Sequence, residues 1–83
     1  MLNLHRDASY WEHWISSAIA KETEQPEHSI STTMPFSNFS LDSIITVTLA
    51  ADLEKAWGRD VNPTIFWEFP DIKTLASWIA TQS

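Results

Sequence analysis

The sequence contains no cysteine, a single glycine and only five basic residues. Without cysteine, the chain can form neither a disulfide nor a thiolate metal site. Its eleven acidic residues give a net charge of −6, which argues against nucleic-acid binding, because that needs clustered lysine and arginine. No apolar run approaches the ~18 residues of a membrane span, and no signal peptide is evident. We therefore expect a cytoplasmic protein that binds neither nucleic acid nor membrane.

The three histidines do not predict a metal site. His5, His13 and His28 all lie in the first third of the chain, without the close spacing that metal ligands usually show. We interpret each of them as a solvated or helix-capping side chain, and we expect no bound metal.

Several strong helix signals are present, and no segment shows the sustained alternation typical of a strand. With 83 residues, the chain has room for one domain, residues 1–83, of which residues 1–8 are expected to be flexible. A capping box at Ser9 and Glu12 predicts that the first helix starts there, and Pro26 predicts that it ends near Glu24. Residues 26–41 form a long connection whose apolar residues, including Phe36, should pack over the core.

Three further helices are predicted downstream. Asp42 can cap a helix that runs to about Trp57, with Gly58 in the left-handed position that follows it. Pro63 can open a short helix over residues 64–67, and Asp71 can cap a last helix that runs through residue 79. The sequence therefore predicts an all-α bundle of four helices, three main ones and a short third.

The second of these helices has two apolar faces. At about 100° per residue, one face contains the predicted core residues Ile45, Thr46, Leu49, Leu53, Ala56 and Trp57. Ile44, Val47 and Ala51 fall on the opposite side, which should face water in so small a bundle. This second stripe is a candidate surface for a partner protein, unless the long connection folds over it.

Residues 35–44 read Pro-Phe-Ser-Asn-Phe-Ser-Leu-Asp-Ser-Ile. This run resembles the attachment motif of acyl carrier proteins, in which a Phe-containing loop leads to Gly-x-Asp-Ser-Leu at a helix start. Residues 63–70, Pro-Thr-Ile-Phe-Trp-Glu-Phe-Pro, resemble the matching segment of polyketide-synthase-type carriers. The similarity extends from Pro35 to Ile79.

The resemblance implies a four-helix carrier-protein bundle and a non-enzymatic function. Ser43 would carry a covalent phosphopantetheine arm derived from coenzyme A, and Asp42 would help a phosphopantetheinyl transferase to hold its divalent metal. The arm would hold acyl intermediates as thioesters for fatty-acid, polyketide or related secondary-metabolite synthesis. Its partners would be the transferase and the acyl-transferring and condensing enzymes of a synthase. We expect a monomer, and because Met1 lies close to the first helix, a free-standing one.

Two residues depart from the motif. Ile44 replaces the usual Leu with a side chain of the same size, and Ser40 replaces the usual Gly. Since a left-handed backbone is costly for a residue other than glycine, we expect Ser40 at negative φ, with its hydroxyl hydrogen-bonded in a local turn.

Two alternatives stay open at this point. The first is a carrier-like helical interaction module that is not phosphopantetheinylated, which the change at Ser40 motivates. The second is a small hydrolase that uses Ser43, Asp42 and a histidine. Adjacent Asp and Ser do not fit a catalytic triad, because the Asp must orient the histidine, so we favour the carrier.

Overall fold

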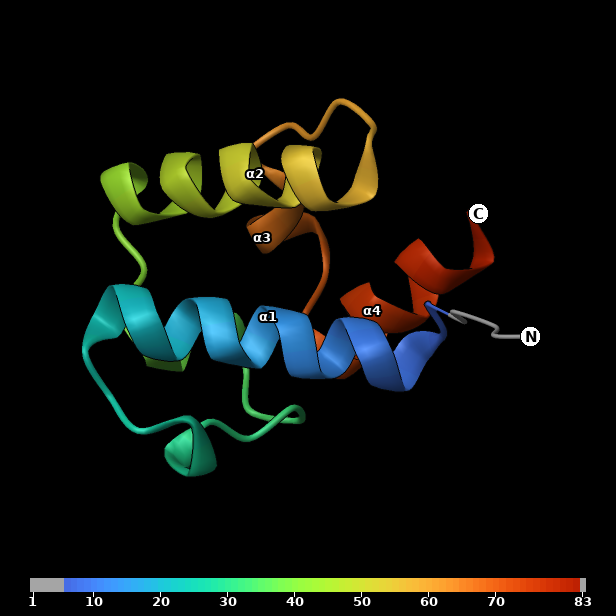
Figure 1. Ribbon diagram of the computed structural model, residues 1–83. Helices are drawn as coiled ribbons and strands as arrows, with labels where there is room; N and C mark the ends of the chain where they lie inside the picture. The colour runs from blue at the N-terminus through green and yellow to red at the C-terminus, as the bar shows by residue number, and fades with distance from the viewer. Residues whose placement is uncertain (1–5, 83) are drawn as a thin grey trace.

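The computed structural model describes residues 6–82 and shows a bundle of helices (Figure 1). The elements in chain order are α1 (Ala8–Thr23), the 3₁₀ helices η1 (Glu27–Ser29) and η2 (Phe36–Phe39), α2 (Ser43–Trp57), α3 (Ile65–Glu68) and α4 (Ile72–Thr81). Residues 6–82 contain no strand, only an isolated antiparallel bridge between Pro35 and Asp71. The predicted all-α bundle of three main helices and a short third is confirmed.

The predicted ends of α2 and the predicted start of α4 are also confirmed. The backbone N–H of Ile45 donates to Asp42 Oδ1 at 2.8 Å, and the N–H of Thr74 donates to Asp71 Oδ1 at 2.9 Å. The hydrogen bond from the Thr74 backbone is the main reason why the pKa of Asp71 lies below its ordinary value of 3.8. Gly58 ends α2 in the left-handed conformation, with φ at 82°.

The predicted start of α1 is wrong. Asp7, and not Ser9, is the N-cap, and its side chain accepts a hydrogen bond from the N–H of Tyr10 at 2.9 Å. Asp caps a helix as well as Ser does, and capping at Asp7 adds Ala8 and Ser9 to the helix. Of the segment 1–8 that we expected to be flexible, residues 1–5, with His5, lie outside the described residues, and Ala8 is already helical.

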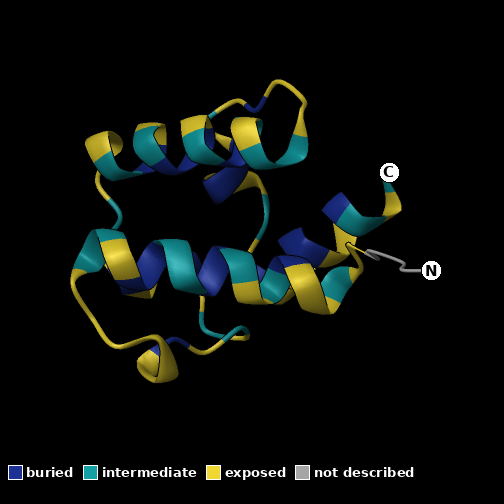
Figure 2. Cartoon of the chain, viewed as in Figure 1, coloured by how far each residue is buried: buried dark blue, intermediate teal, exposed yellow. Residues whose placement is uncertain are grey.

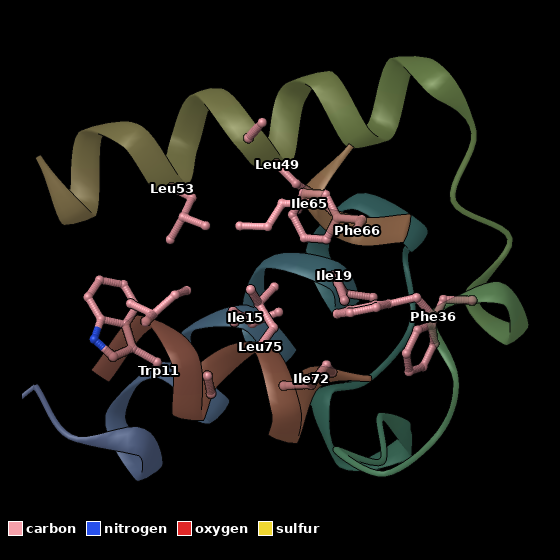
Figure 3. Packing of buried hydrophobic residues seen from close by; sticks show 14 of the residues in the cluster. Trp11, Ile15, Ile19, Phe36, Leu49, Leu53, Ile65, Phe66, Ile72 and Leu75 are labelled. Atoms are coloured by element: carbon pink, nitrogen blue, oxygen red, sulfur yellow. The ribbon is translucent and has the colours of Figure 1, made fainter. Parts of the chain in front are cut away.

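The core lies between α1, α2 and α4, whose buried faces meet in one cluster (Figures 2 and 3). α1 makes its most extensive helix contact with α4. The largest fully buried apolar side chains are Trp11, Ile15 and Ile19 of α1, Leu49 and Leu53 of α2, and Ile72, Leu75 and Ile79 of α4. On α2 the predicted core residue Thr46 is buried, whereas Ile45, Ala56 and Trp57 are half-buried at its edge.

The connection between α1 and α2 packs over the core, as predicted. Ile30, Phe36 and Phe39 are buried, and the rings of Phe36 and Phe66 meet edge to face with centroids 5.6 Å apart. Backbone hydrogen bonds join this connection to the start of α4: Phe36 N–H donates to Pro70 O at 3.0 Å, and Lys73 N–H donates to Thr32 O at 2.9 Å. The last residues before α2 are therefore held at a fixed place on the bundle.

The predicted negative φ of Ser40 is wrong. Ser40 ends η2 at φ 55° and ψ 44°, which is the left-handed region, and its hydroxyl has no hydrogen-bond partner among residues 6–82. Buried Phe39 precedes it and half-buried Leu41 follows it. The packing of these two side chains fixes the direction of the chain on both sides, so the loop cannot relax without withdrawing one of them from the core.

Replacing Ser40 with glycine should therefore stabilise the fold. A left-handed L-residue costs on the order of 1–2 kcal/mol, and the greater freedom of glycine in the unfolded chain offsets part of that gain. We expect Ser40→Gly to raise the free energy of unfolding by about 0.5–1 kcal/mol, as measured by urea denaturation. Ser37→Gly is the matched control, because Ser37 lies in the same 3₁₀ helix at negative φ, and it should destabilise the fold. If both variants shift stability alike, the left-handed backbone at Ser40 carries no strain.

Candidate functional site

Ser43 is the first residue of α2, and its side chain is exposed. Asp42 precedes it with extended backbone, and its carboxylate occupies the cap by accepting the Ile45 N–H. No described residue forms a hydrogen bond with the Ser43 hydroxyl, although the Ser43 carbonyl accepts one from Thr46 Oγ1 at 3.0 Å. The hydroxyl is therefore available for covalent modification without loss of an existing hydrogen bond.

The surroundings of Ser43 suit a phosphodiester. The first N–H groups of a helix have no partner within the helix, and the positive end of its dipole favours a negative group. The carboxylate of Asp42 uses one oxygen for its cap, and its second oxygen has no hydrogen-bond partner among residues 6–82. That oxygen can ligate a cation supplied from outside the chain.

No histidine in the described part of the chain forms a hydrogen bond with Ser43. His13 of α1 is paired with Glu27, with 3.3 Å between Nδ1 and Oε2, and His28 is exposed in η1. Residues 6–82 contain no group of three side chains able to hold a metal ion. A serine hydroxyl is a weak nucleophile without a base, so a reaction at Ser43 needs another protein to activate it.

The second apolar face of α2 lies open. Ile44 is 75% exposed and Val47 is 56% exposed, and Ala51 is exposed on the same side of the helix. The connection between α1 and α2 packs elsewhere, which removes the alternative in which it covers these residues. Ile44 adjoins Ser43 in the sequence, so an enzyme that reaches the serine hydroxyl also meets the start of this stripe.

A groove of about 500 Å³ opens beside the start of α2. Its walls come from η2 and the residues after it, from Thr46 of α2 and from α3, and its lining residues include Phe36, Leu41, Phe66 and Trp67. Trp67 is 63% exposed. Apolar periodicity does not predict this groove, because a helix of four residues is too short for its pattern to distinguish a buried aromatic side chain from an exposed one.

Within residues 6–82, no helix combines the length and the apolarity that a membrane span requires.

Comparison with known proteins connects this geometry to a family. The family model described as "Phosphopantetheine attachment site" matches residues 13–79. The chain is 26% identical over 69 residues to polyketide synthase PksL of Bacillus subtilis, and the match covers 83% of this chain and 2% of that synthase. It is 29% identical over 65 residues to the cluster 41 polyketide synthase of Aspergillus flavus, and the match covers 78% of this chain and 5% of that synthase. The chain thus spans only a few per cent of the length of these relatives.

Two solved structures have the same fold. A free-standing peptidyl carrier protein from an Acinetobacter baumannii secondary metabolic pathway superposes with a TM-score of 0.88 at 30% identity, covering 93% of this chain and 96% of that one. The HMG-ACPI domain of the CurA module from Lyngbya majuscula superposes with a TM-score of 0.85 at 19% identity, covering 99% of this chain and 85% of that one. The latter likeness concerns the fold alone.

Carrier domains of this kind are not catalytic, and their family carries a covalently attached phosphopantetheine group. The free hydroxyl at the start of α2 fits such a group, and the match covers most of the chain. The chain belongs to the phosphopantetheine-binding carrier-protein family, with its relatives among the polyketide synthases.

Proposed function

We propose that Ser43 carries the phosphopantetheine arm and that the arm holds acyl intermediates as thioesters during polyketide, fatty-acid or related secondary-metabolite synthesis. The observation that carries this proposal is the Ser43 hydroxyl, which is exposed at the first residue of α2 and has no hydrogen-bond partner among residues 6–82. Asp42 already caps the helix, so Ser43 is not needed as its cap.

The arm supplies a thiol, which this cysteine-free chain lacks. The chain itself would present the Ser43 oxygen, keep it at the positive end of a helix and leave the proton to be removed by a phosphopantetheinyl transferase. The other partners are the acyl-transferring and condensing enzymes of a synthase, which the carrier serves as a monomer. We place it in a reducing compartment such as the cytoplasm, where a thiol stays free to form thioesters.

The groove beside the start of α2 supports an apolar acyl cargo. Phe36, Leu41 and Phe66 contribute apolar side chains to it, and it begins at Ser40 and Leu41, close to Ser43 in the sequence. An acyl chain that folds back from the arm can remove its apolar surface from water there.

An aminoacyl or peptidyl cargo is the second candidate, favoured by the likeness to the Acinetobacter baumannii peptidyl carrier protein at 30% identity. The Asp before Ser43, in place of the Gly-Gly-His of many peptidyl carriers, supports the acyl cargo. The mass of the intermediate released from the natively loaded protein distinguishes the two candidates.

Modification should occur at Ser43 alone. Incubation with a phosphopantetheinyl transferase, coenzyme A and Mg²⁺ should add one phosphopantetheine mass to the intact protein. Ser43→Ala should abolish this gain and leave the circular dichroism spectrum and the melting temperature nearly unchanged, because the hydroxyl is exposed and forms no hydrogen bond with residues 6–82. An undiminished mass gain in Ser43→Ala would remove the proposal. A folded wild-type protein that no active transferase modifies would favour the unmodified interaction module.

The charge of Asp42 should matter for modification and much less for folding. Asn caps a helix about as well as Asp, so Asp42→Asn should change the free energy of unfolding by less than about 1 kcal/mol. The same variant loses the carboxylate that we expect to ligate the metal of the transferase, so the rate of mass gain should fall at least tenfold. Asp71→Asn, at the equivalent cap of α4, is the matched control and should be modified at the wild-type rate. Equal rates for both variants would mean that Asp42 is only a cap.

The open face of α2 should bind the partner enzymes. Val47→Glu places a charge in the middle of the stripe, so it should slow modification by the transferase severalfold without unfolding the domain, because Val47 is 56% exposed. Ser77→Glu, which adds the same charge at an exposed position of α4, should leave the rate unchanged. If Val47→Glu is modified as fast as Ser77→Glu, the stripe does not contact the transferase.

A further inference from the structure

A second groove, of about 730 Å³, lies between the N-terminal half of α1 and the segment from η1 to Thr32. In Figure 1, the chain around η1 lies across α1 from α2. The groove shares no lining residue with the one beside Ser43. Nothing in the proposed carrier function uses it.

The lining of this groove is acidic. It includes the carboxylates of Asp7, Glu12 and Glu27 and contains no lysine or arginine. The contact between His13 and Glu27 joins its two walls, since His13 belongs to α1 and Glu27 to η1. A cation that enters this groove therefore meets carboxylates from both sides. Arg6 is not part of the lining, although its guanidinium lies 5.6 Å from the centre of the Tyr10 ring at one end of the groove.

Ser16 gives an independent indication of a ligand. It lines the groove and is only 6% exposed, yet its hydroxyl has no hydrogen-bond partner among residues 6–82. Hydroxyl side chains within helices often donate to the carbonyl four residues earlier, as Thr23 does to Ile19 at 2.7 Å and Thr48 does to Ile44 at 3.0 Å. Ser16 makes no such bond. The enclosed polar side-chain atoms without a partner among residues 6–82 are Trp11 Nε1 and Trp57 Nε1, so the Ser16 hydroxyl is not enclosed and is open to a ligand in the groove.

We propose that this groove binds a lysine- or arginine-bearing segment of a partner protein. The positive head group lies between Glu12 and Glu27 and donates a hydrogen bond to Ser16 Oγ. Its aliphatic stem packs on the apolar surface of Trp14 and Ile30. A volume of about 730 Å³ is that of a site for several side chains and far exceeds the space of a single ion, which is why the occupant is a peptide segment.

The test titrates the full, ¹⁵N-labelled chain with the peptide acetyl-Lys-Leu-Lys-Leu-Lys-amide and follows its amide shifts by NMR. The shifts should concentrate in residues 7–17 and 27–32, and the matched acidic peptide acetyl-Glu-Leu-Glu-Leu-Glu-amide should cause none there. Glu12→Gln with Glu27→Gln should weaken binding at least tenfold. Glu22→Gln with Asp60→Asn removes the same charge outside the groove and should leave the affinity within about twofold.

Ser16→Ala separates a ligand-binding role from a structural one. Because the hydroxyl is unbonded and alanine is the better helix former, the melting temperature should rise in this variant. Affinity for the basic peptide should nevertheless fall, on the order of tenfold, because a hydrogen bond to a charged group is lost. A lower melting temperature with unchanged affinity would show that Ser16 serves the fold alone.

Three results overturn the proposal: no binding of the basic peptide, shifts centred on the Ile44 and Val47 face, or equal weakening by the two charge-removing pairs of substitutions. None of them bears on the arm, because the variants in this groove leave Ser43 untouched. Glu12→Gln with Glu27→Gln should gain the phosphopantetheine mass at the wild-type rate, so failure here and failure at Ser43 are told apart by the same mass measurement.

Discussion

The placement of Ser43 depends on the anchoring of Phe36. This side chain is buried against Phe66 of α3. The backbone N–H of Phe36 donates a hydrogen bond to the carbonyl oxygen of Pro70, two residues after the end of α3. Phe39, one 3₁₀ turn later, is buried as well. Only three residues separate Phe39 from Ser43, so the two rings set where α2 can begin. The left-handed backbone at Ser40 is a consequence of the same constraint, since the chain must turn there to bury Phe39 and still enter α2. The side chains that build this part of the core therefore also determine where Ser43 lies.

The aspartate caps of α2 and α4 have the same local geometry and different surroundings. Asp71 accepts hydrogen bonds from both the backbone and the hydroxyl of Thr74, and the next residue, Ile72, is fully buried. Its folded-state pKa lies below 3.8, so this cap stabilises the fold at neutral pH, and the contribution is lost as the pH falls through the lowered value. Asp42 accepts one hydrogen bond, from Ile45, and the residue after it is the exposed Ser43. The cap of α4 fixes a core helix, whereas the cap of α2 leaves a carboxylate oxygen and a hydroxyl facing solvent.

The parts of the fold that the sequence predicts are those governed by local chemistry. The caps at Asp42 and Asp71 and the left-handed Gly58 follow from side-chain type and spacing, as does the outward face with Ile44 and Val47. The predicted start of α1 was wrong because Asp7, two residues before Ser9, is an equally good cap. The errors and omissions arise from tertiary restraints. The conformation of Ser40 is imposed by the aromatic residues before it, and the exposure of Trp67 by the docking of a single helical turn.

A carrier must present one serine to several enzymes in turn, so each contact has to be short-lived. The exposed stripe on α2 contains only Ile44, Val47 and Ala51, and it is too small to form a stable interface by itself. Apolar contacts of this kind also discriminate poorly between partners, whereas charged contacts exclude wrong ones. The acidic groove between α1 and the η1 segment would help the carrier to distinguish between partner proteins, and it lies away from the arm on Ser43. When a partner has formed one of these two weak contacts, the other forms at a high effective concentration, because both are on one rigid domain. The affinity of a partner that makes both contacts is therefore higher than that of either contact alone, and each single contact still dissociates quickly. Ser43 would then remain free to move from one enzyme to the next.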